Sequence, residues 1–348
     1  MAPKDSSPGA GPPRSFRGRA VPAPDLAQVG AAVILFHCLF LYGGSATLFR
    51  DSDTGWHIRT GERILEQRAV PHADPYSFTR EGKAWMDWEL ATDAITGLAH
   101  RAAGLKGVAW LYGLAIAGGV WLWARLTWAA GGDFLIACAM MPVMASTASL
   151  HWLARPHLVG WIWMLVTLLA SEKAPAAWKR WHAVAAFAVG SLWANTHASF
   201  VLGLAVLVLN ASGEAVAWAL WHAGDARRAR WHLLAAAFGL AGTLLNPYGF
   251  GLHAHVAKYL ADGELLARVA EFQTFNFHAE GAGWAVTVLA LTIAGAAFAL
   301  QQKQAGRFLV LVFFAAVALR SARGLPLAAM AALPLANGAM TLALCRMD

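Results

Sequence analysis

The sequence predicts an all-α membrane protein: a polytopic transmembrane helical bundle of about ten spans, with the N- and C-termini cytoplasmic. Two observations lead to this prediction. Of the 348 residues, 58% are hydrophobic and only 14% are charged, a composition that a water-soluble domain of this size could not keep off its surface. Apolar segments close to the length that crosses a hydrocarbon core of about 30 Å also recur along the chain with short polar breaks between them.

Apolar runs give the expected spans directly. They are residues 27–48, 107–127, 133–151, 156–171, 181–196, 198–221, 231–246, 281–301, 307–322 and 324–345. A span needs about 20 residues, and the fourth, fifth and ninth runs are shorter. The alternative is that two of these short runs form a re-entrant pair, which enters and leaves the membrane on the same side.

The chain divides into two parts. Residues 1–26 are rich in Pro, Gly and Ser, which is typical of a disordered cytoplasmic tail. Residues 27–348 form one transmembrane domain, and its first apolar run is expected to act as an uncleaved anchor because it starts late and is long enough to span.

Charge supports this orientation, because Lys and Arg in short loops are retained in the cytoplasm. With the N-terminus inside, the inner segments contain 14 of the 27 bases and 7 of the 20 acids, which leaves 13 of each outside. The whole net charge of +7 then lies on the inner face. Topology therefore explains the basic composition, and no clustered basic motif indicates nucleic-acid binding.

The three cysteines predict no disulfide or metal framework. Cys38, Cys138 and Cys345 all lie in apolar segments, at different depths.

The first outer loop, residues 49–106, is the most informative segment. From Thr54, a candidate N-cap, residues 54–66 have one apolar helical face, typical of a helix on the membrane surface. A second amphipathic face follows over residues 85–98, with Trp85, Trp88, Ile95 and Leu98 on one side and Asp87, Glu89 and Asp93 on the other. Two such helices predict a lid over the outer mouth of the bundle.

Two acids, Asp51 and Asp53, begin this loop. Carboxylates this close can share a divalent cation such as Mg²⁺ or Mn²⁺, or each can repel the charge of the other so that the pKa of one of the two is raised. Alternatively, one is a general base, which contributes roughly 10²- to 10⁴-fold in rate. The plainer interpretation is that Asp51 and Thr54 only cap the helix.

Arg155 is expected at the outer end of a span, because an Arg at the centre costs about 2.5–3.5 kcal/mol. Its planar guanidinium matches phosphate oxygens, with His157 beside it. Arg320 and Arg323 bracket another outer turn and could bind the same anion. The alternative is that Arg155 only extends to the membrane interface.

Other outer turns add candidate ligands. His57, Asn195, His197, Asn246 and Glu271 all fall on the same predicted face. Asn195 and His197 are alternatively a helix-end pair. His253 and His255 would bind a metal together only if their segment were extended.

An outer site of this kind restricts the chemistry. Nucleotide-sugars are made in the cytoplasm and do not cross the membrane unaided, so a group transfer outside needs a donor carried by lipid, such as a polyprenyl-phosphate sugar. The phosphate would need Arg, His or a cation, and the acceptor hydroxyl would need a carboxylate base.

Several sequence blocks carry a family resemblance. In order, DSDTGWHIRTGERIL, PHADPYSFTREGKAWMDWELATD, RPHL, WANTHASFVLGL, LNPYG and RGLPL resemble a family of mostly uncharacterised bacterial membrane proteins related to the GT-C class of glycosyltransferases. The resemblance covers about residues 27–340. It implies a polytopic helical fold, a lipid-phosphate sugar donor and an essential acidic motif that matches Asp51 and Asp53, with His57 close behind.

The chain departs from that family at three places. The motif often written His-Gly-Gly is His197-Ala198-Ser199 here, and the later Glu-Trp is Glu271-Phe272. The expected extramembranous C-terminal domain, which often helps to recognise the acceptor, is not seen before Asp348.

Three functions compete. The first is a glycosyltransferase in the bacterial cytoplasmic membrane that moves a sugar from polyprenyl phosphate to an extracytoplasmic glycolipid, cell-wall polymer or protein, with Asp53 as base and Asp51 in support. The second is a transporter or flippase of a lipid-linked or anionic substrate, for which Glu214 and His37 are the mid-span candidates. The third is a non-catalytic assembly subunit.

Overall fold

The computed structural model describes residues 25–175 and 177–347, and this part of the chain is almost wholly helical. Its only β-bridge joins Ala73 and Ala84 in the first outer loop. The all-α prediction is therefore confirmed for the described residues. The tail predicted over residues 1–26 lies outside them, except for its last two residues.

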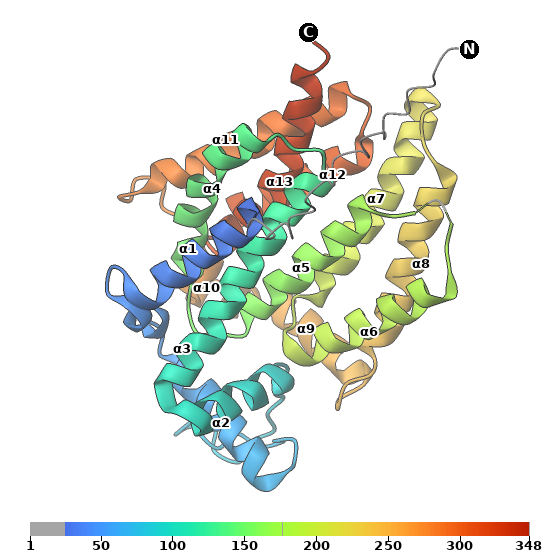
Figure 1. Cartoon of the computed structure of the whole chain (residues 1–348). Coiled ribbons are helices and arrows are strands. Elements are labelled where there is room, and N and C mark those ends of the chain that lie inside the picture. The colour runs from blue at the N-terminus through green and yellow to red at the C-terminus, as the bar shows by residue number, and fades with distance from the viewer. Residues whose placement is uncertain (1–24, 176, 348) are drawn as a thin grey trace, which may run out of the picture.

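Helices of very different length make up the bundle (Figure 1). The α-helices are α1 (Leu26–Phe40), α2 (Asp53–Gln67), α3 (Leu90–Ala129), α4 (Phe134–Ala148), α5 (His157–Glu172), α6 (Arg180–Thr196), α7 (Phe200–Trp221), α8 (Ala226–Thr243), α9 (Phe250–Ala261), α10 (Gly263–Arg268), α11 (Ala282–Gln301), α12 (Ala305–Arg320) and α13 (Gly324–Leu344). Short 3-10 helices are η1 (Gly44–Phe49), η2 (Ser149–His151) and η3 (Ala270–Phe272).

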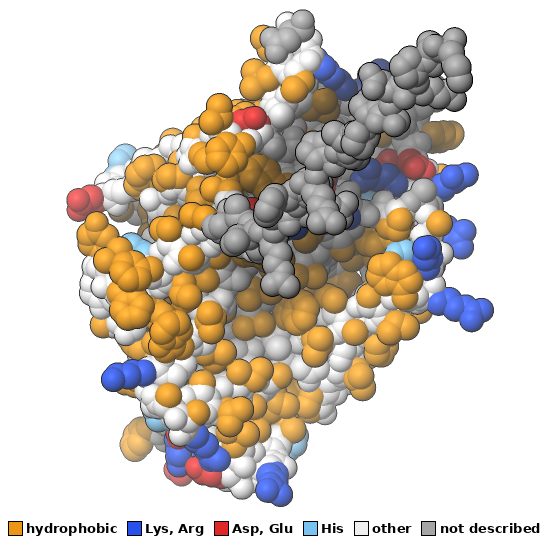
Figure 2. Space-filling view, in the orientation of Figure 1, with side chains coloured by type: hydrophobic (Ala, Val, Ile, Leu, Met, Phe, Trp, Pro, Cys, Tyr) orange, Lys and Arg blue, Asp and Glu red, His pale blue; other side chains and the backbone are white. Residues whose placement is uncertain are grey.

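Five helical segments are long and apolar enough to cross a membrane: α3, α4 with η2, α7, α11 and α13. The other five expected spans also coincide with helices, α1, α5, α6, α8 and α12, which are shorter or more polar. Hydrophobic side chains cover most of the face in Figure 2, while Lys and Arg gather at its right edge and lower end. This distribution fits a protein embedded in a membrane.

Helix α13 is the centre of the bundle. Every residue from 324 to 339 is buried, and the helix packs against α3, α4, α11 and α12. The indole of Trp123 on α3 is fully buried and donates a hydrogen bond to the Ala329 carbonyl on α13, with 3.2 Å between nitrogen and oxygen. Because α3 continues into the first outer loop, this packing also holds the loop.

Helix α3 bends where it leaves the bundle. At Gly104 the backbone has φ 59° and ψ −151°, a conformation that is open essentially to glycine alone. The part before the bend packs on α2, and the two backbones meet at Gly61 and Gly97. A Cβ on Gly97 would overlap the backbone of Gly61, so this crossing requires both glycines.

The structure corrects two details of the first outer loop. The second expected amphipathic helix is the start of α3, and Trp85 and Trp88 precede it. Its acids face inward: Asp93 is completely buried, whereas Ile95 and Leu98 are 50% and 58% exposed. The reason is that Asp93 pairs with His57 of α2, which leaves the apolar side facing outward.

The start of α2 also differs from the expectation. Thr54 is not the N-cap, because the helix already begins at Asp53 and the Thr54 side chain is buried inside it. The Asp51 carboxylate accepts a hydrogen bond from the Asp53 backbone N–H, at 2.8 Å, so one part of the capping interpretation holds.

Replacing Gly97 with alanine should separate α2 from α3. Overpacking of this kind costs about 1–3 kcal/mol, so we expect Gly97→Ala to lower the unfolding temperature of the purified protein in detergent. Gly118→Ala is the matched control on the same helix, since a Cβ there meets no atom within 4 Å and alanine is the better helix former. Equal unfolding temperatures for the two variants would contradict the close crossing.

Candidate active site

A cavity of about 480 Å³ lies at the end of the bundle where α2 and the start of α3 meet the first turns of α5, α7 and α13. Its charged and histidine lining comes from five segments far apart in the sequence. These residues are Asp53, His57, Glu89, His151, Arg155, His157, His197 and Arg323. Most of the side chains predicted from the sequence are therefore brought together in one cavity.

Arg155 lies in the short turn between η2 and α5, and three carboxylates surround it. One terminal nitrogen is 2.7 Å from Asp51 Oδ2 and 2.8 Å from Glu271 Oε1, and the other is 2.9 Å from Asp53 Oδ2. The Arg155 side chain is only 12% exposed. A guanidinium this buried is stable only when it is paired, and these acids provide the pairing.

Glu271 links this arginine to the turn between α12 and α13. Its second oxygen is 2.7 Å from Arg323 Nε, and the Arg323 backbone N–H donates to the Glu271 carbonyl. A hydrogen bond from His151, together with the charges of Arg323 and Arg155, holds the pKa of Glu271 well below its usual range. The carboxylate is therefore ionised at any physiological pH.

A second cluster lies deeper in the cavity. His57 Nδ1 is 2.7 Å from Asp93 Oδ1, and His57 Nε2 is 3.8 Å from Glu89 Oε2. The other Glu89 oxygen is 3.4 Å from His197 Nε2. Burial raises the pKa of Glu89 to about 7, although His57 opposes the shift. Burial also raises the pKa of the adjacent Asp87 to about 6.

The histidines of the cavity are held in place by polar contacts. His157 Nε2 lies 2.8 Å from the His151 carbonyl, and His197 Nδ1 lies 2.8 Å from Ser199 Oγ. Burial lowers the pKa of His197 to about 3 and also lowers the pKa of His57. The arginines therefore provide the lasting positive charge of this cavity.

Three predicted residues neither line the cavity nor pair with Arg155. The Asn195 amide donates to the carbonyls of Ser191 and Leu245, both at 2.8 Å, which ties α6 to the end of α8. Asn246 closes its own turn through the Thr243 and Gly249 carbonyls. Arg320 ends α12 with an exposed side chain, and it is not among the residues that line the cavity.

Sequence reasoning missed Glu89 as a site residue, and also His151. A signal was present: Glu89 and Asp93 are four residues apart and so share one helical face, in a segment otherwise rich in Trp and Leu. Acids placed together in such a segment need a buried polar partner. That partner is His57, which was predicted.

The two acids at the start of the loop do not form a ready cation site. Asp51 and Asp53 both direct an oxygen at Arg155, and the other Asp51 oxygen accepts the Asp53 N–H. Within residues 25–175 and 177–347, no group of three or more His, Cys, Asp or Glu could hold a metal ion. His253 and His255 lie on α9, where residues two apart point away from each other, so their segment is not extended.

No protein-family model, curated protein or solved structure matches the chain.

The raised pKa of Glu89 predicts a pH-dependent stability. The folded protein keeps its proton up to about pH 7, whereas the unfolded carboxyl loses it near 4.5. Between these values the unfolded state binds fewer protons, so stability falls as pH rises, by up to about 3 kcal/mol.

In Glu89→Gln this fall should become smaller by the share of Glu89, while the raised pKa of Asp87 keeps part of it. Unfolding temperatures measured from pH 4.5 to 8 would then decline less steeply in the variant than in the unchanged protein. Glu264→Gln, at a carboxylate that is 77% exposed, is the control and should keep the original slope. Parallel slopes for all three proteins would show that Glu89 ionises normally in the folded state.

Proposed function

We propose that this protein is a membrane glycosyltransferase, related to the GT-C class, that moves a sugar from a polyprenyl-phosphate donor to an extracytoplasmic acceptor. One observation carries the proposal: a single cavity has a charged end at the helix starts, with Asp53, Arg155 and Arg323, and an apolar end one or two turns further along α5 and α13, with Met164 and Leu327. The acceptor would be a glycolipid, a cell-wall polymer or a protein.

The apolar end suits the chain of the donor. It is lined by residues of α5, α7, α9, α12 and α13, among them Trp161, Met164, Val201, Leu202, Leu260, Val317 and Leu327. A prenyl chain lying there would bring its phosphate to the charged end. Cavities of this size, mostly apolar with a few convergent polar groups, are typical of ligand sites.

The arginines suit the phosphate. A guanidinium has five N–H donors, and the three carboxylates around Arg155 do not use them all. Asp51 and Glu271 are not part of the cavity lining, so their contacts orient the guanidinium from behind. Arg323, which lies over the Phe272 ring, is 29% exposed and adds a second positive charge.

The transfer itself needs one base and one stabilised leaving group. Asp53, 39% exposed, takes the proton of the acceptor hydroxyl while that oxygen bonds to the anomeric carbon of the sugar. The bond from this carbon to the phosphate oxygen breaks, and its electron pair leaves with the polyprenyl phosphate. Arg155 and Arg323 stabilise the charge that develops there.

The proposal includes the topology. Ten spans with both ends in the cytoplasm would put the cavity on the extracytoplasmic side of a bacterial cytoplasmic membrane, where a lipid-linked donor is needed. The charge distribution supports it, because the inner segments would carry the whole net charge of +7.

Among the described residues, the two mid-span candidates for transport make only local contacts. Glu214 accepts a hydrogen bond from the Asp225 backbone N–H and pairs with Arg228. His37 packs its ring against Tyr42 and Trp152. Both mid-span candidates therefore have local partners, and a flippase or a non-catalytic subunit stays the alternative.

Sugar transfer by the reconstituted protein tests the proposal. With labelled polyprenyl-phosphate sugars and membrane-extract acceptors, we expect transfer that falls at least about a hundredfold in Asp53→Asn, since the base is lost. Donor binding should persist in this variant. Binding of the donor without transfer, unchanged by Asp53→Asn, would instead favour transport.

Two variants that conserve the charge, Arg155→Lys and Arg320→Lys, test the phosphate site. Arg155→Lys keeps the charge but loses the planar pair of donors, so donor affinity measured by equilibrium binding should fall about tenfold or more. Arg320→Lys is the matched control and should bind as the unchanged protein does. Equal affinities for both variants would remove Arg155 from the donor site.

A further inference from the structure

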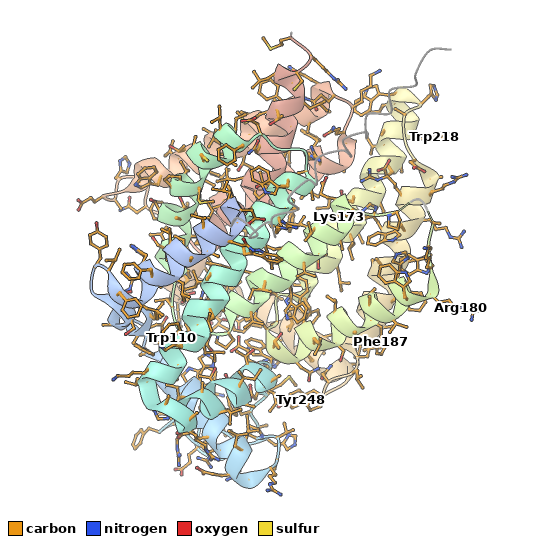
Figure 3. The ribbon with its side chains drawn as sticks, viewed as in Figure 1. Trp110, Lys173, Arg180, Phe187, Trp218 and Tyr248 are labelled. Carbon is orange, nitrogen blue, oxygen red and sulfur yellow. The ribbon has the colours of Figure 1, made fainter. Side chains whose placement is uncertain are left out.

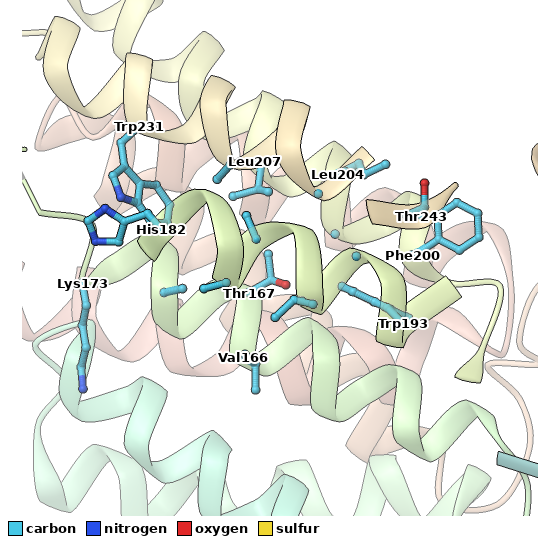
Figure 4. A pocket seen from close by; sticks show the side chains of 18 of the residues that line it. Val166, Thr167, Lys173, His182, Trp193, Phe200, Leu204, Leu207, Trp231 and Thr243 are labelled. Atoms are coloured by element: carbon cyan, nitrogen blue, oxygen red, sulfur yellow. The ribbon is translucent and has the colours of Figure 1, made fainter. Parts of the chain in front are cut away.

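A second cavity, of about 290 Å³, lies between α5, α6, α7 and α8 (Figure 4). Helix α6 packs chiefly on α8 and only slightly on α5 and α7, which leaves a slot between them. The contact between α6 and α8 is close, because a Cβ on Gly190 would overlap the Gly239 backbone. None of the side chains of the Arg155 cavity lines this slot.

The slot is long and narrow. It follows α6 from Trp181 to Trp193, which at about 1.5 Å per residue is about 18 Å. Its walls are small or apolar, and the two threonines in it have partners already: Thr167 donates to the Trp163 carbonyl and Thr243 to the Leu240 carbonyl. An apolar cavity of this kind excludes water and accepts apolar ligands.

One end of the slot differs from the rest. The rings of His182 and Trp231 lie together there and Lys173 lies at the same end, with its side chain directed away from the two rings, while Trp193, Phe200 and Thr243 lie at the opposite end in Figure 4. The Trp231 side chain is buried, and no acceptor for its indole N–H exists among the described residues. A buried donor without a partner is unfavourable. A ligand with an acceptor oxygen at this end would therefore be stabilised by a hydrogen bond from the Trp231 N–H.

The surroundings of this end are typical of a membrane interface. Helix α5 starts beside the Arg155 cavity and ends at Glu172, so Lys173 lies at the other end of the bundle (Figure 3). The rings of Trp178 and Trp231 are 5.9 Å apart there, and aromatic clusters of this kind favour the headgroup level. Lys179 and Arg180 follow in the same connection and add positive charge.

We propose that this slot binds one acyl chain of an anionic phospholipid, from the leaflet opposite to the Arg155 cavity. The phosphate of that lipid accepts a hydrogen bond from Trp231 Nε1 and pairs with Lys173, while the chain fills the slot as far as Phe200. A polyprenyl phosphate fits less well, because its chain is far longer than a slot of about 18 Å.

Such a lipid would also contact the wall that separates the two cavities. The Trp193 ring closes the far end of the slot, and its indole N–H donates to Ser199 Oγ at 3.0 Å. Ser199 in turn contacts His197 of the Arg155 cavity. The lipid is therefore expected to support the active-site wall, and its binding does not depend on sugar transfer.

Native mass spectrometry of the delipidated protein tests this proposal. Phosphatidylglycerol, phosphatidylcholine and a polyprenyl phosphate would be added separately at equal concentration. We expect one retained phosphatidylglycerol per protein and much weaker retention of phosphatidylcholine. Trp231→Phe combined with Lys173→Gln should bind phosphatidylglycerol about tenfold more weakly, because a charge-assisted hydrogen bond is lost.

A slot-filling variant keeps the proposal testable if the headgroup variant fails to fold. Ala185 lines the slot, and Ala185→Phe should abolish retention, whereas Ala188→Phe, on the same exposed helix but outside the slot, should not. Lys303→Gln is the charge control. Equal retention of both phospholipids, undiminished retention of phosphatidylglycerol in Ala185→Phe, or retention of the polyprenyl phosphate that Ala185→Phe lowers would each overturn the proposal.

Discussion

The pairing of one buried guanidinium determines the arrangement of the end of the bundle that holds the Arg155 cavity. Arg155 reaches a site where an unpaired charge would be costly, so the carboxylates of Asp51, Asp53 and Glu271 must converge on it. These acids belong to the first outer loop and to η3. Glu271 extends the cluster to the turn between α12 and α13, and the cavity takes its shape from this convergence.

Two environments then coexist in one cavity. Around Arg155 the acids are paired with cations, and the pKa of Glu271 is far below its usual range. Around His57 the acids are buried with little positive charge, and the pKa of Glu89 rises to about 7. At neutral pH these two carboxyl groups therefore differ in charge, because Glu271 is ionised whereas Glu89 is partly protonated.

Local rules explain what could be predicted. Apolar runs of spanning length predicted the helices, and the cost of an Arg inside a span predicted that Arg155 lies at a helix end and faces a polar cavity. Glu89 was missed because nothing local says which face of the 85–98 segment is buried; the pairing of His57 with Asp93 decides it. Asn195 and Asn246, predicted as ligands, do not line the cavity for a related reason. Their amides satisfy backbone carbonyls of neighbouring turns, which sequence spacing does not reveal.

Hydrogen–deuterium exchange of Arg155→Gln against the unchanged protein tests the central claim most directly. If Arg155 holds the distant segments together, backbone amides in residues 50–57, 270–273 and 320–324 should all exchange faster in the variant, while α11 is unaffected. Faster exchange confined to residues 151–158, with the other segments unchanged, would contradict the account.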